Sequence, residues 1–337
     1  MKILVTGGAG FIGSHTVVEL YAAGFEAVIL DNYDNSEPKV LDGLTKILGH
    51  SVKNYIGDFG DVVLLNQIFK SEKIDGVIHF AAHKAVGESV SNPLKYYANN
   101  VGKTVTLLEV MLANGINNFV FSSSCTVYGQ PDYLPVTEET PTQPASSPYG
   151  NTKQMCEGII RDTALSGASF RAIALRYFNP IGAHESALIG ELPKGVPSNL
   201  VPFVTQTAAG IRQKLTVFGS DYNTSDGTCV RDFIHVVDLA KAHVQAINIL
   251  QKLTKHSYYD TFNIGTGCGN TVLEVINTFE EVTGVKVNYE IGPRRDGDIE
   301  QIFAEVTKSK EKLGWQTQKN LAQGLKDAWR WQQELAK

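Results

Sequence analysis

The sequence predicts an α/β fold, in which a Rossmann-type, doubly wound parallel sheet is followed by a smaller, mixed α/β C-terminal domain. Three observations support this fold class. Short β-branched runs alternate with longer helical patterns through the first half of the chain, which indicates β-α-β units. A turn with three spaced glycines directly follows the first of these runs. After about residue 180 the regular alternation ends.

The elements of the first half are predicted in chain order from these runs. The first run, KILV, is continuous and apolar and predicts a buried strand at residues 2–5, and the pattern after it predicts a helix at 11–23. Residues 129–148 are rich in Pro, Thr and Ser and are predicted to form a loop. The further predicted strands are 27–30, 76–82, 119–124 and 170–178, and the further predicted helices are 95–114 and 149–165.

The second half is predicted to form a separate domain. Residues 179–199 contain many Gly and Pro residues with weak periodicity, which is typical of a functional loop or lid. Short strands such as LTVFG, TFNIG and KVNYE follow, mixed with short helices. We therefore expect one domain at residues 1–178, a second at residues 179–337 and a cleft between them. The second domain is free to return elements to the first, which sequence alone does not reveal.

Composition and charge favour a small-molecule partner. The net charge is -5 and Lys and Arg form no run, so there is no electrostatic basis for binding nucleic acid or an anionic membrane. No stretch approaches the ~18 apolar residues of a membrane span, and the first ten residues do not resemble a signal peptide, so we expect a cytoplasmic protein. The cysteines lack metal-ligand spacing and are expected to be free thiols, with no metal site. They are Cys125, Cys156, Cys229 and Cys268.

The glycine turn predicts a dinucleotide site. Gly7, Gly10 and Gly13 allow a tight turn, close approach of the backbone to a pyrophosphate and close packing of the helix on the strand. Asp31 ends the second strand, where a carboxylate accepts hydrogen bonds from a ribose and repels a 2′-phosphate, so NAD is favoured over NADP. The alternative for Asp31 is a strand-end turn former. Asp58 follows a later strand and is expected to face the adenine edge.

A tyrosine, a lysine and a serine are the candidate catalytic residues. Tyr149 and Lys153 are four residues apart, so a helix presents them on one face. An ammonium about 4 Å from the phenol, at an effective dielectric of about 20, lowers its pKa by at most about three units. Ser124 follows a strand, at the edge of a parallel sheet where ligands bind. The Tyr-x-x-x-Lys spacing alone also fits a surface pair, but the three features together favour catalysis.

The chain resembles the extended short-chain dehydrogenase/reductase family, in particular its UDP-glucose 4-epimerase branch. The similarity runs nearly end to end and includes TGGAGFIGSH, DNYDNS, HFAAHKAVGES, FSSSCTVYG, SPYGNTK, LRYFNPIGAH and GTCVRDFIHVVDLAKAH. It implies that residues 1–178 bind NAD, that residues 179–337 bind a UDP-sugar, and that the protein interconverts UDP-galactose and UDP-glucose. It also implies a homodimer, formed through helices 95–114 and 149–165.

The resemblance further implies a mechanism. Tyr149 takes the proton of the sugar 4-hydroxyl while a hydride passes from carbon 4 to NAD, and the hydride then returns to the opposite face of the sugar. Lys153 holds the cofactor ribose and lowers the pKa of the phenol, and Ser124 bonds the 4-oxygen. These three residues therefore contact the cofactor, and Ser124 and Tyr149 also contact the substrate.

The same resemblance assigns binding residues to this chain. For the cofactor they are Phe11, Ile12, Asp31, Asn32, Asn35, Ser36, Asp58, Phe59, Phe80, Ala81, Lys84, Asn99 and Phe178. For the UDP-sugar they are Tyr177, Asn179, Asn199, Leu200, Thr216, Val217, Phe218, Arg231, Arg295, Asp298 and Ile302. Arginines are suited to a diphosphate, although an ion pair with Asp232 is the alternative for Arg231. Ile302 stands at a wall position where size decides whether N-acetylated sugars enter, and its intermediate size leaves their acceptance open.

Two other functions compete with this hypothesis. A sugar-nucleotide 4,6-dehydratase of the same superfamily is disfavoured, because its added Asp-Glu pair is replaced here by Cys125 and Thr126. A non-catalytic NAD-binding sensor is expected to have lost the Tyr/Lys pair, which this chain retains.

Structural roles are expected for three histidines, and two glutamates are expected to lie in solvent. They are His79, His83 and His235, and Glu138 and Glu139.

Overall fold

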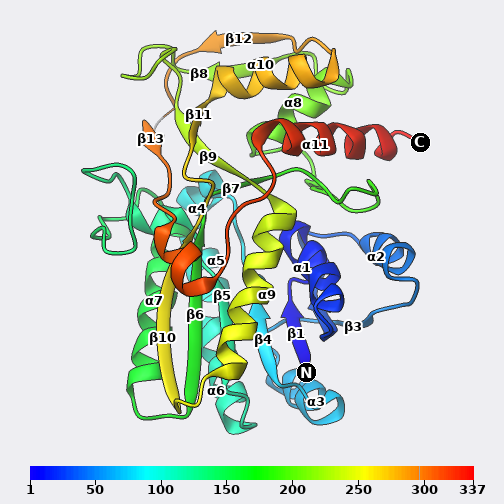
Figure 1. The fold of residues 1–337 in the computed structure, drawn as a ribbon, viewed down its shortest axis with the longest axis vertical. Coiled ribbons are helices and arrows are strands. Elements are labelled where there is room, and N and C mark those ends of the chain that lie inside the picture. Colours follow the sequence, from blue (N-terminus) through cyan, green and yellow to red (C-terminus); the bar gives the residue numbers. More distant parts are fainter. Residues whose placement is uncertain (296) are drawn as a thin grey trace.

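The computed structural model describes residues 1–295 and 297–337 and is built on a seven-stranded sheet (Figure 1). The strand order is β10-β6-β5-β4-β1-β2-β3, and every pairing in it is parallel. The strands are β1 (Lys2–Thr6), β2 (Glu26–Asp31), β3 (Lys53–Ile56), β4 (Gly76–His79), β5 (Asn118–Ser122), β6 (Phe170–Tyr177) and β10 (Ser257–Ile264). The Rossmann-type parallel sheet predicted from the sequence is confirmed.

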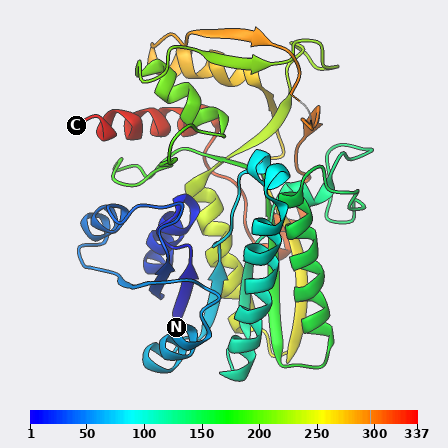
Figure 2. The ribbon, with the colours of Figure 1, turned by 180° about the vertical axis from the view of Figure 1, so that it is seen from behind.

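Helices cover both faces of this sheet and enclose two apolar cores. On β1, Ile3 and Val5 belong to one core and Leu4 to the other, which is why the strand is a continuous apolar run. Figure 1 looks onto the face with α1 and α9, and Figure 2 onto the face with α6 and α7. The first face carries α1 (Phe11–Ala22), α2 (Val40–Leu48) and α9 (Val236–Lys252), and the second carries α3 (Val62–Glu72), α6 (Lys103–Ala113) and α7 (Pro148–Leu165).

The helix predicted at residues 95–114 is interrupted. After α4 (Val86–Ser91), the chain forms α5 (Pro93–Tyr96), a π-helical turn, η1 (Tyr97–Gly102), and then α6. Within η1, the carbonyl of Asn100 accepts hydrogen bonds from the Thr104 hydroxyl and the Cys156 thiol. Side-chain donors that compete for a helical carbonyl favour such a local irregularity.

A smaller mixed part packs at the carboxyl ends of the parallel strands. Its four-stranded sheet contains β7 (Asn179–Ile181), β9 (Val230–His235), β11 (Gly269–Thr271) and β13 (Gln301–Ile302). A two-stranded sheet pairs β8 (Leu215–Phe218) with β12 (Tyr289–Gly292). The helices of this part are α8 (Leu200–Ala208), α10 (Val272–Thr283) and α11 (Leu321–Leu335). Two short helical turns complete the chain: η2 (Cys125–Tyr128) follows β5, and η3 (Ser309–Leu313) precedes α11.

The predicted boundary at residue 178 does not separate the two parts. Beyond it, β9 runs directly into α9, which packs against α1, and β10 pairs with β6 along all eight of its residues. The chain therefore returns to the first part after building some of the second, as the sequence analysis allowed. A short β-branched run such as TFNIG has the same pattern in either sheet, so its place is decided by the neighbour it pairs with.

Candidate active site

The glycine turn joins β1 to α1 and needs its glycines for steric reasons. Gly7 has a φ of 70°, and a Cβ on it would lie 2.8 Å from the backbone nitrogen of Ala81. A Cβ on Gly13 would lie 2.3 Å from the Gly7 carbonyl oxygen. The first N–H groups of α1 lack partners within the helix, and Gly10, its N-cap, offers no side chain to them. The space and the donors fit the pyrophosphate of a dinucleotide.

Asp31 connects this turn to the loop that follows β2. Its Oδ2 accepts a hydrogen bond from the Ala9 backbone N–H at 3.0 Å. Its Oδ1 accepts from the Tyr33 N–H at 2.9 Å and from the Ser36 hydroxyl at 2.8 Å. The turn-forming interactions named as the alternative for Asp31 are thus present, and the carboxylate stands at the predicted ribose position at the end of β2.

The other predicted cofactor residues lie along the same edge of the sheet. They follow the carboxyl ends of β1 to β6 or lie on η1 and α7, because parallel strands all end at one edge. Asp58 accepts from the Gly60 N–H at 2.7 Å and pairs with Lys103 at 2.5 Å. Phe59 packs against His79, with ring centres 4.8 Å apart.

The catalytic candidates meet where α7 crosses the end of β5. The hydroxyl of Ser147 caps α7 by accepting from the Gly150 N–H at 3.2 Å, which starts the helix just before Tyr149. Tyr149 and Lys153 are both buried, and Ser124 lies close enough to lower the pKa of the Tyr149 phenol. The Lys153 ammonium donates to the Ser122 carbonyl oxygen at 2.7 Å and lies 5.9 Å from the centre of the Tyr149 ring.

Burial is the largest cause of the pKa shift of Tyr149 in this structure. Burial raises the pKa of Tyr149 well above its usual range, and the neighbouring Tyr177 raises it further, while the bond to Ser124 lowers it. Burial also lowers the pKa of Lys153 to about 8. Lys153 is not among the largest causes of this shift, and its lowering of the phenol's pKa stays a prediction. The spacing sets the shared helix face, but the flexible lysine side chain turns to the Ser122 carbonyl.

The predicted substrate residues lie on the smaller part and at its junction with the sheet. Arg231 and Arg295 share Asp298, whose Oδ1 is 4.0 Å from an Arg231 nitrogen and 2.6 Å from an Arg295 nitrogen. Asp232 faces away from Arg231 and accepts from the Thr266 N–H at 2.8 Å. The alternative ion pair of Arg231 with Asp232 is absent among the described contacts, because successive strand residues point to opposite faces.

The remaining substrate candidates lie on several elements of the smaller part and at the end of β6. Tyr177 ends β6, Asn179 begins β7, Asn199 stands at the N-cap position of α8 ahead of Leu200, and residues 216–218 lie on β8. Ile302 is opposite Arg231 in the register of β13 and β9, and it packs with Cys125 and Phe178 in one buried apolar cluster. Ile302 therefore shares a cluster with Cys125, the residue after the candidate catalytic Ser124.

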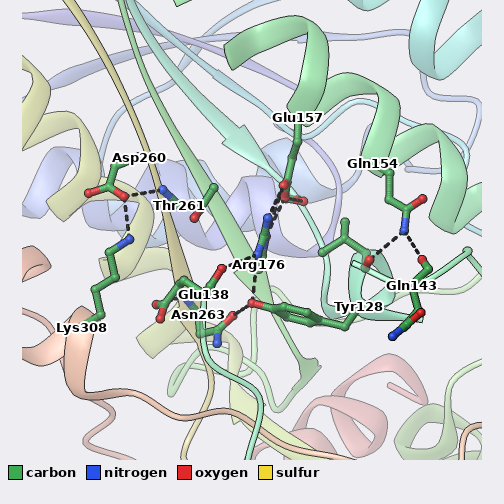
Figure 3. Close-up of polar contacts among 12 residues, drawn as sticks. Tyr128, Glu138, Gln143, Gln154, Glu157, Arg176, Asp260, Thr261, Asn263 and Lys308 are labelled. Atoms are coloured by element: carbon green, nitrogen blue, oxygen red, sulfur yellow. Dashed lines mark hydrogen bonds and ion pairs between the residues drawn. The ribbon is translucent and has the colours of Figure 1, made fainter. Parts of the chain in front are cut away.

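Sequence reasoning missed several buried polar residues. Glu138, predicted to lie in solvent, accepts from the Asn263 N–H at 2.7 Å, and burial raises its pKa. Glu157 and Arg176 form a buried ion pair at 2.7 Å (Figure 3). A signal for Glu157 was available, since it follows Lys153 by one further helical turn. Charged residues rarely point inward from a helix unless they are paired.

The histidines have the structural roles predicted for them. His79 is buried, with Nδ1 2.7 Å from the Thr6 hydroxyl, and His235 is buried with Nε2 3.2 Å from Asp327. His83 packs against Tyr96, with ring centres 5.6 Å apart.

Within the described residues, no group of three or more His, Cys, Asp or Glu is arranged to hold a metal ion. Nor does any described helix have the length and apolar character needed to cross a membrane.

Comparison with known proteins assigns the chain to a family. Residues 4–328 match the family model described as GDP-mannose 4,6 dehydratase. The chain is 48% identical to the UDP-glucose 4-epimerase of Haemophilus influenzae, over 100% of this chain and 99% of that protein. It is 49% identical to the UDP-glucose 4-epimerase of Bacillus subtilis, over 98% and 97%. This chain belongs to the UDP-glucose 4-epimerase family.

Solved epimerases share the fold described above. The UDP-glucose 4-epimerase of Bifidobacterium longum in complex with NAD⁺ and UDP is 46% identical, with a TM-score of 0.95 over 99% of this chain and 98% of that one. The one from Stenotrophomonas maltophila, with bound NAD and formylated UDP-arabinopyranose, is 45% identical, with a TM-score of 0.96 over 100% and 99%. The UDP-Glc/GlcNAc 4-epimerase of Campylobacter jejuni is 38% identical, with a TM-score of 0.84 over 99% of each chain.

The glycine turn of this epimerase-family chain yields a direct test. Replacing Gly13→Ala places a methyl group against the Gly7 carbonyl, so the turn must open. We expect at least tenfold weaker binding of NAD, used as a dinucleotide probe in calorimetry, and a loss of about 1–3 kcal/mol in stability. The control is Gly158→Ala on α7, where the added Cβ meets nothing within 4 Å. Unchanged NAD affinity in the Gly13 variant would contradict a pyrophosphate site at this turn.

Proposed function

We propose that this chain interconverts UDP-galactose and UDP-glucose, with NAD as a resident cofactor, by transient oxidation at carbon 4 of the sugar. The observation that carries the proposal is the burial of Tyr149 and Lys153 on one face of α7, beside Ser124 at the sheet edge where the glycine turn lies. Membership of the epimerase family and the NAD-bound relatives support the same reaction.

The residues along the sheet edge divide the binding of NAD between them. The glycine turn and the start of α1 hold the pyrophosphate, and the Asp31 carboxylate accepts from the adenosine ribose. Lys153 contacts the second ribose, and the loop with Phe80, Ala81 and Lys84 lines the crevice. When bound, NAD supplies the hydride acceptor and donor for carbon 4.

Tyr149 is the residue that transfers the proton in the proposed reaction. It takes the proton of the sugar 4-hydroxyl and later returns it, while Ser124 hydrogen-bonds the 4-oxygen and holds it in reach. Burial keeps the phenol protonated in the chain alone, because it raises the phenol's pKa. A positive charge in addition to the Lys153 ammonium is therefore needed before the phenol loses its proton, and an oxidised nicotinamide would carry such a charge.

The UDP part is assigned to the smaller part of the molecule. Arg231 and Arg295, fixed through Asp298, are placed to bind the diphosphate, and Asn179, Asn199 and Phe218 to contact the nucleoside. The further contacts are assigned to Tyr177, Leu200, Thr216 and Val217. Ile302 is buried against Cys125 and narrows the sugar pocket. We therefore rank unmodified hexoses above N-acetylated ones.

Dehydration is the less favoured alternative. The matching family model is described as GDP-mannose 4,6 dehydratase. In this chain, however, the two positions at which a dehydratase has its additional acid and base hold Cys125 and Thr126. Burial raises the pKa of the Cys125 thiol to about 12, so it exchanges protons poorly at neutral pH. Epimerisation needs only the acid and base that Tyr149 supplies.

The test of this function starts from purified protein and UDP-galactose without added NAD. We expect UDP-glucose to form, because the resident cofactor is regenerated in each turnover. Parallel assays with UDP-N-acetylgalactosamine rank the two sugar classes. A failure to form UDP-glucose even with NAD added contradicts the function, and a higher kcat/KM for the acetylated pair contradicts the ranking.

The role of Tyr149 is tested separately. Tyr149→Phe removes the hydroxyl and keeps the ring, so we expect NAD and UDP to bind as in the wild type while kcat falls at least about a hundredfold. Tyr133→Phe is the matched control, because Tyr133 is 84% exposed in the loop before α7. Wild-type epimerisation by the Tyr149 variant would exclude it as the base.

We also propose a cytoplasmic homodimer, formed through the predicted helices 95–114 and 149–165 together with the adjoining α4 and α5. Val90, Leu94 and Met155 are exposed apolar side chains on these helices, and Leu94 is 80% exposed. Light scattering is expected to give about twice the 36.8 kDa chain mass. Leu94→Lys should shift the particle towards the monomer, whereas Val196→Lys on the loop before α8 should not. A wild-type particle of single-chain mass at micromolar concentration would contradict the dimer.

A further inference from the structure

Three consecutive serines at the end of β5 pair with three residues on one face of α7. The serines are Ser122, Ser123 and Ser124, and Tyr149, Lys153 and Glu157 follow one another at intervals of four residues. Tyr149 lies beside Ser124, which lowers the pKa of its phenol, and Lys153 donates to the Ser122 carbonyl oxygen at 2.7 Å. The third pair is formed by Ser123, whose hydroxyl donates to Glu157 Oε1 at 2.5 Å.

Glu157 is fully engaged although it is buried. Arg176 of β6 donates from Nε to both carboxylate oxygens, at 3.0 and 3.2 Å, and from Nη2 to Oε2 at 2.7 Å. Ser123, Glu157 and Arg176 are each less than 10% exposed. The hydrogen bonds to this buried carboxylate fix the positions of the elements that carry the donors. Loss of a donor leaves part of the buried charge without a partner, which destabilises the fold.

The network continues from Arg176 to the neighbouring elements (Figure 3). Arg176 Nη1 donates to the Tyr128 hydroxyl at 3.1 Å, and Tyr128 donates to Asn263 Oδ1 at 2.6 Å. Tyr128 lies on η2, three residues beyond Cys125, and Asn263 lies on β10. The ends of β5, β6 and β10, together with η2, are therefore joined to one position on α7.

From this ladder of contacts we infer that Glu157 is a positioning residue for the proposed reaction: it clamps α7 to the ends of β5 and β6, and so sets the position of Tyr149 and Lys153 relative to Ser124. The inference rests on the proposed function of those three residues. Glu157 itself is one helical turn beyond Lys153, two turns from Tyr149, and acts through both of them.

The charge of Glu157 also acts on Lys153. Burial lowers the pKa of the Lys153 ammonium to about 8, while Cys156 and Glu157 raise it. The titratable groups that face Lys153 are His79 at the end of β4 and Tyr149, Cys156 and Glu157 on α7 itself. His79 is buried, and its pKa is lowered to about 3, so it is neutral. Burial raises the pKa of the Cys156 thiol to about 11, so this group too is neutral near pH 7. Glu157 is then the anion among these groups whose charge favours a protonated Lys153.

The test is the pH profile of kcat for Glu157→Gln. Glutamine has the same size and still accepts from Ser123, but it lacks the charge. Loss of a neighbouring anion lowers the pKa of Lys153, so the alkaline limb of kcat should move about one unit to lower pH. We expect kcat to fall about threefold at pH 7.5 and about tenfold at pH 9, with little change in KM. Asp162→Asn is the control, because Asp162 is an exposed acid on the same helix that pairs only with Arg161 among the described residues.

A second variant separates charge from geometry. Glu157→Asp keeps the charge but shortens the clamp, so the alkaline limb should stay at its wild-type position while kcat remains reduced. The inference is overturned if Glu157→Gln has the wild-type kcat and the wild-type pH profile. It is also overturned if kcat falls together with stability while the alkaline limb of the pH profile does not move. If Glu157→Gln does not fold, the Glu157→Asp profile decides, and a wild-type kcat there overturns the inference.

Failure of the proposed function gives a different result. In that case neither the wild type nor the Asp162→Asn control converts a UDP-sugar at any pH. The titration of Lys153 is then followed by the NMR shift of its ε-carbon, assigned with Lys153→Met. The same downward shift of about one unit in Glu157→Gln supports the inference, and an unchanged titration overturns it.

Discussion

The arrangement of the candidate site depends on the buried ion pair between Glu157 and Arg176. Removing two charges from water costs several kcal/mol per ion, which only well-placed partners offset. Here the planar guanidinium meets both carboxylate oxygens, and Ser123 and Tyr128 satisfy further lone pairs and donors. Such a pair is stable in one arrangement of α7, β5 and β6, and that arrangement puts Tyr149 beside Ser124.

The same dry environment shifts the ionisable groups around it in opposite directions. Burial raises the pKa of Tyr149 and of the Cys125 thiol and lowers that of Lys153, because in each case it disfavours the charged form. The chain alone therefore holds a neutral phenol. In a site of low dielectric, one added positive charge acts strongly on it, so proton transfer is tied to cofactor binding.

The two parts of the molecule are joined across the crevice by the loop at residues 182–199. Lys194 on this loop donates to the Tyr33 carbonyl oxygen at 2.6 Å, in the loop after β2. Glu191 accepts from Asn199 at 2.6 Å and lies 3.8 Å from the ammonium of Lys84. Residues assigned to the cofactor and to the substrate are thus linked through one buried glutamate.

The sequence by itself determined the features that depend on local geometry. The glycine spacing, the carboxylate at the end of β2 and the strand positions of the first half could be predicted, because a tight turn or a buried parallel strand restricts the residue types it accepts. Tyr149 and Lys153 were also predicted to share one helix face, which follows from helical periodicity alone.

Only the tertiary structure decided which partner each side chain meets. It placed β10 in the seven-stranded sheet and packed α9 against α1. It also turned Lys153 towards the Ser122 carbonyl and buried Glu157 against Arg176. These outcomes depend on packing between segments far apart in the chain. Spacing defines the face on which a residue lies, whereas the hydrogen-bond partners and the burial that shift its pKa are supplied by whatever element packs there.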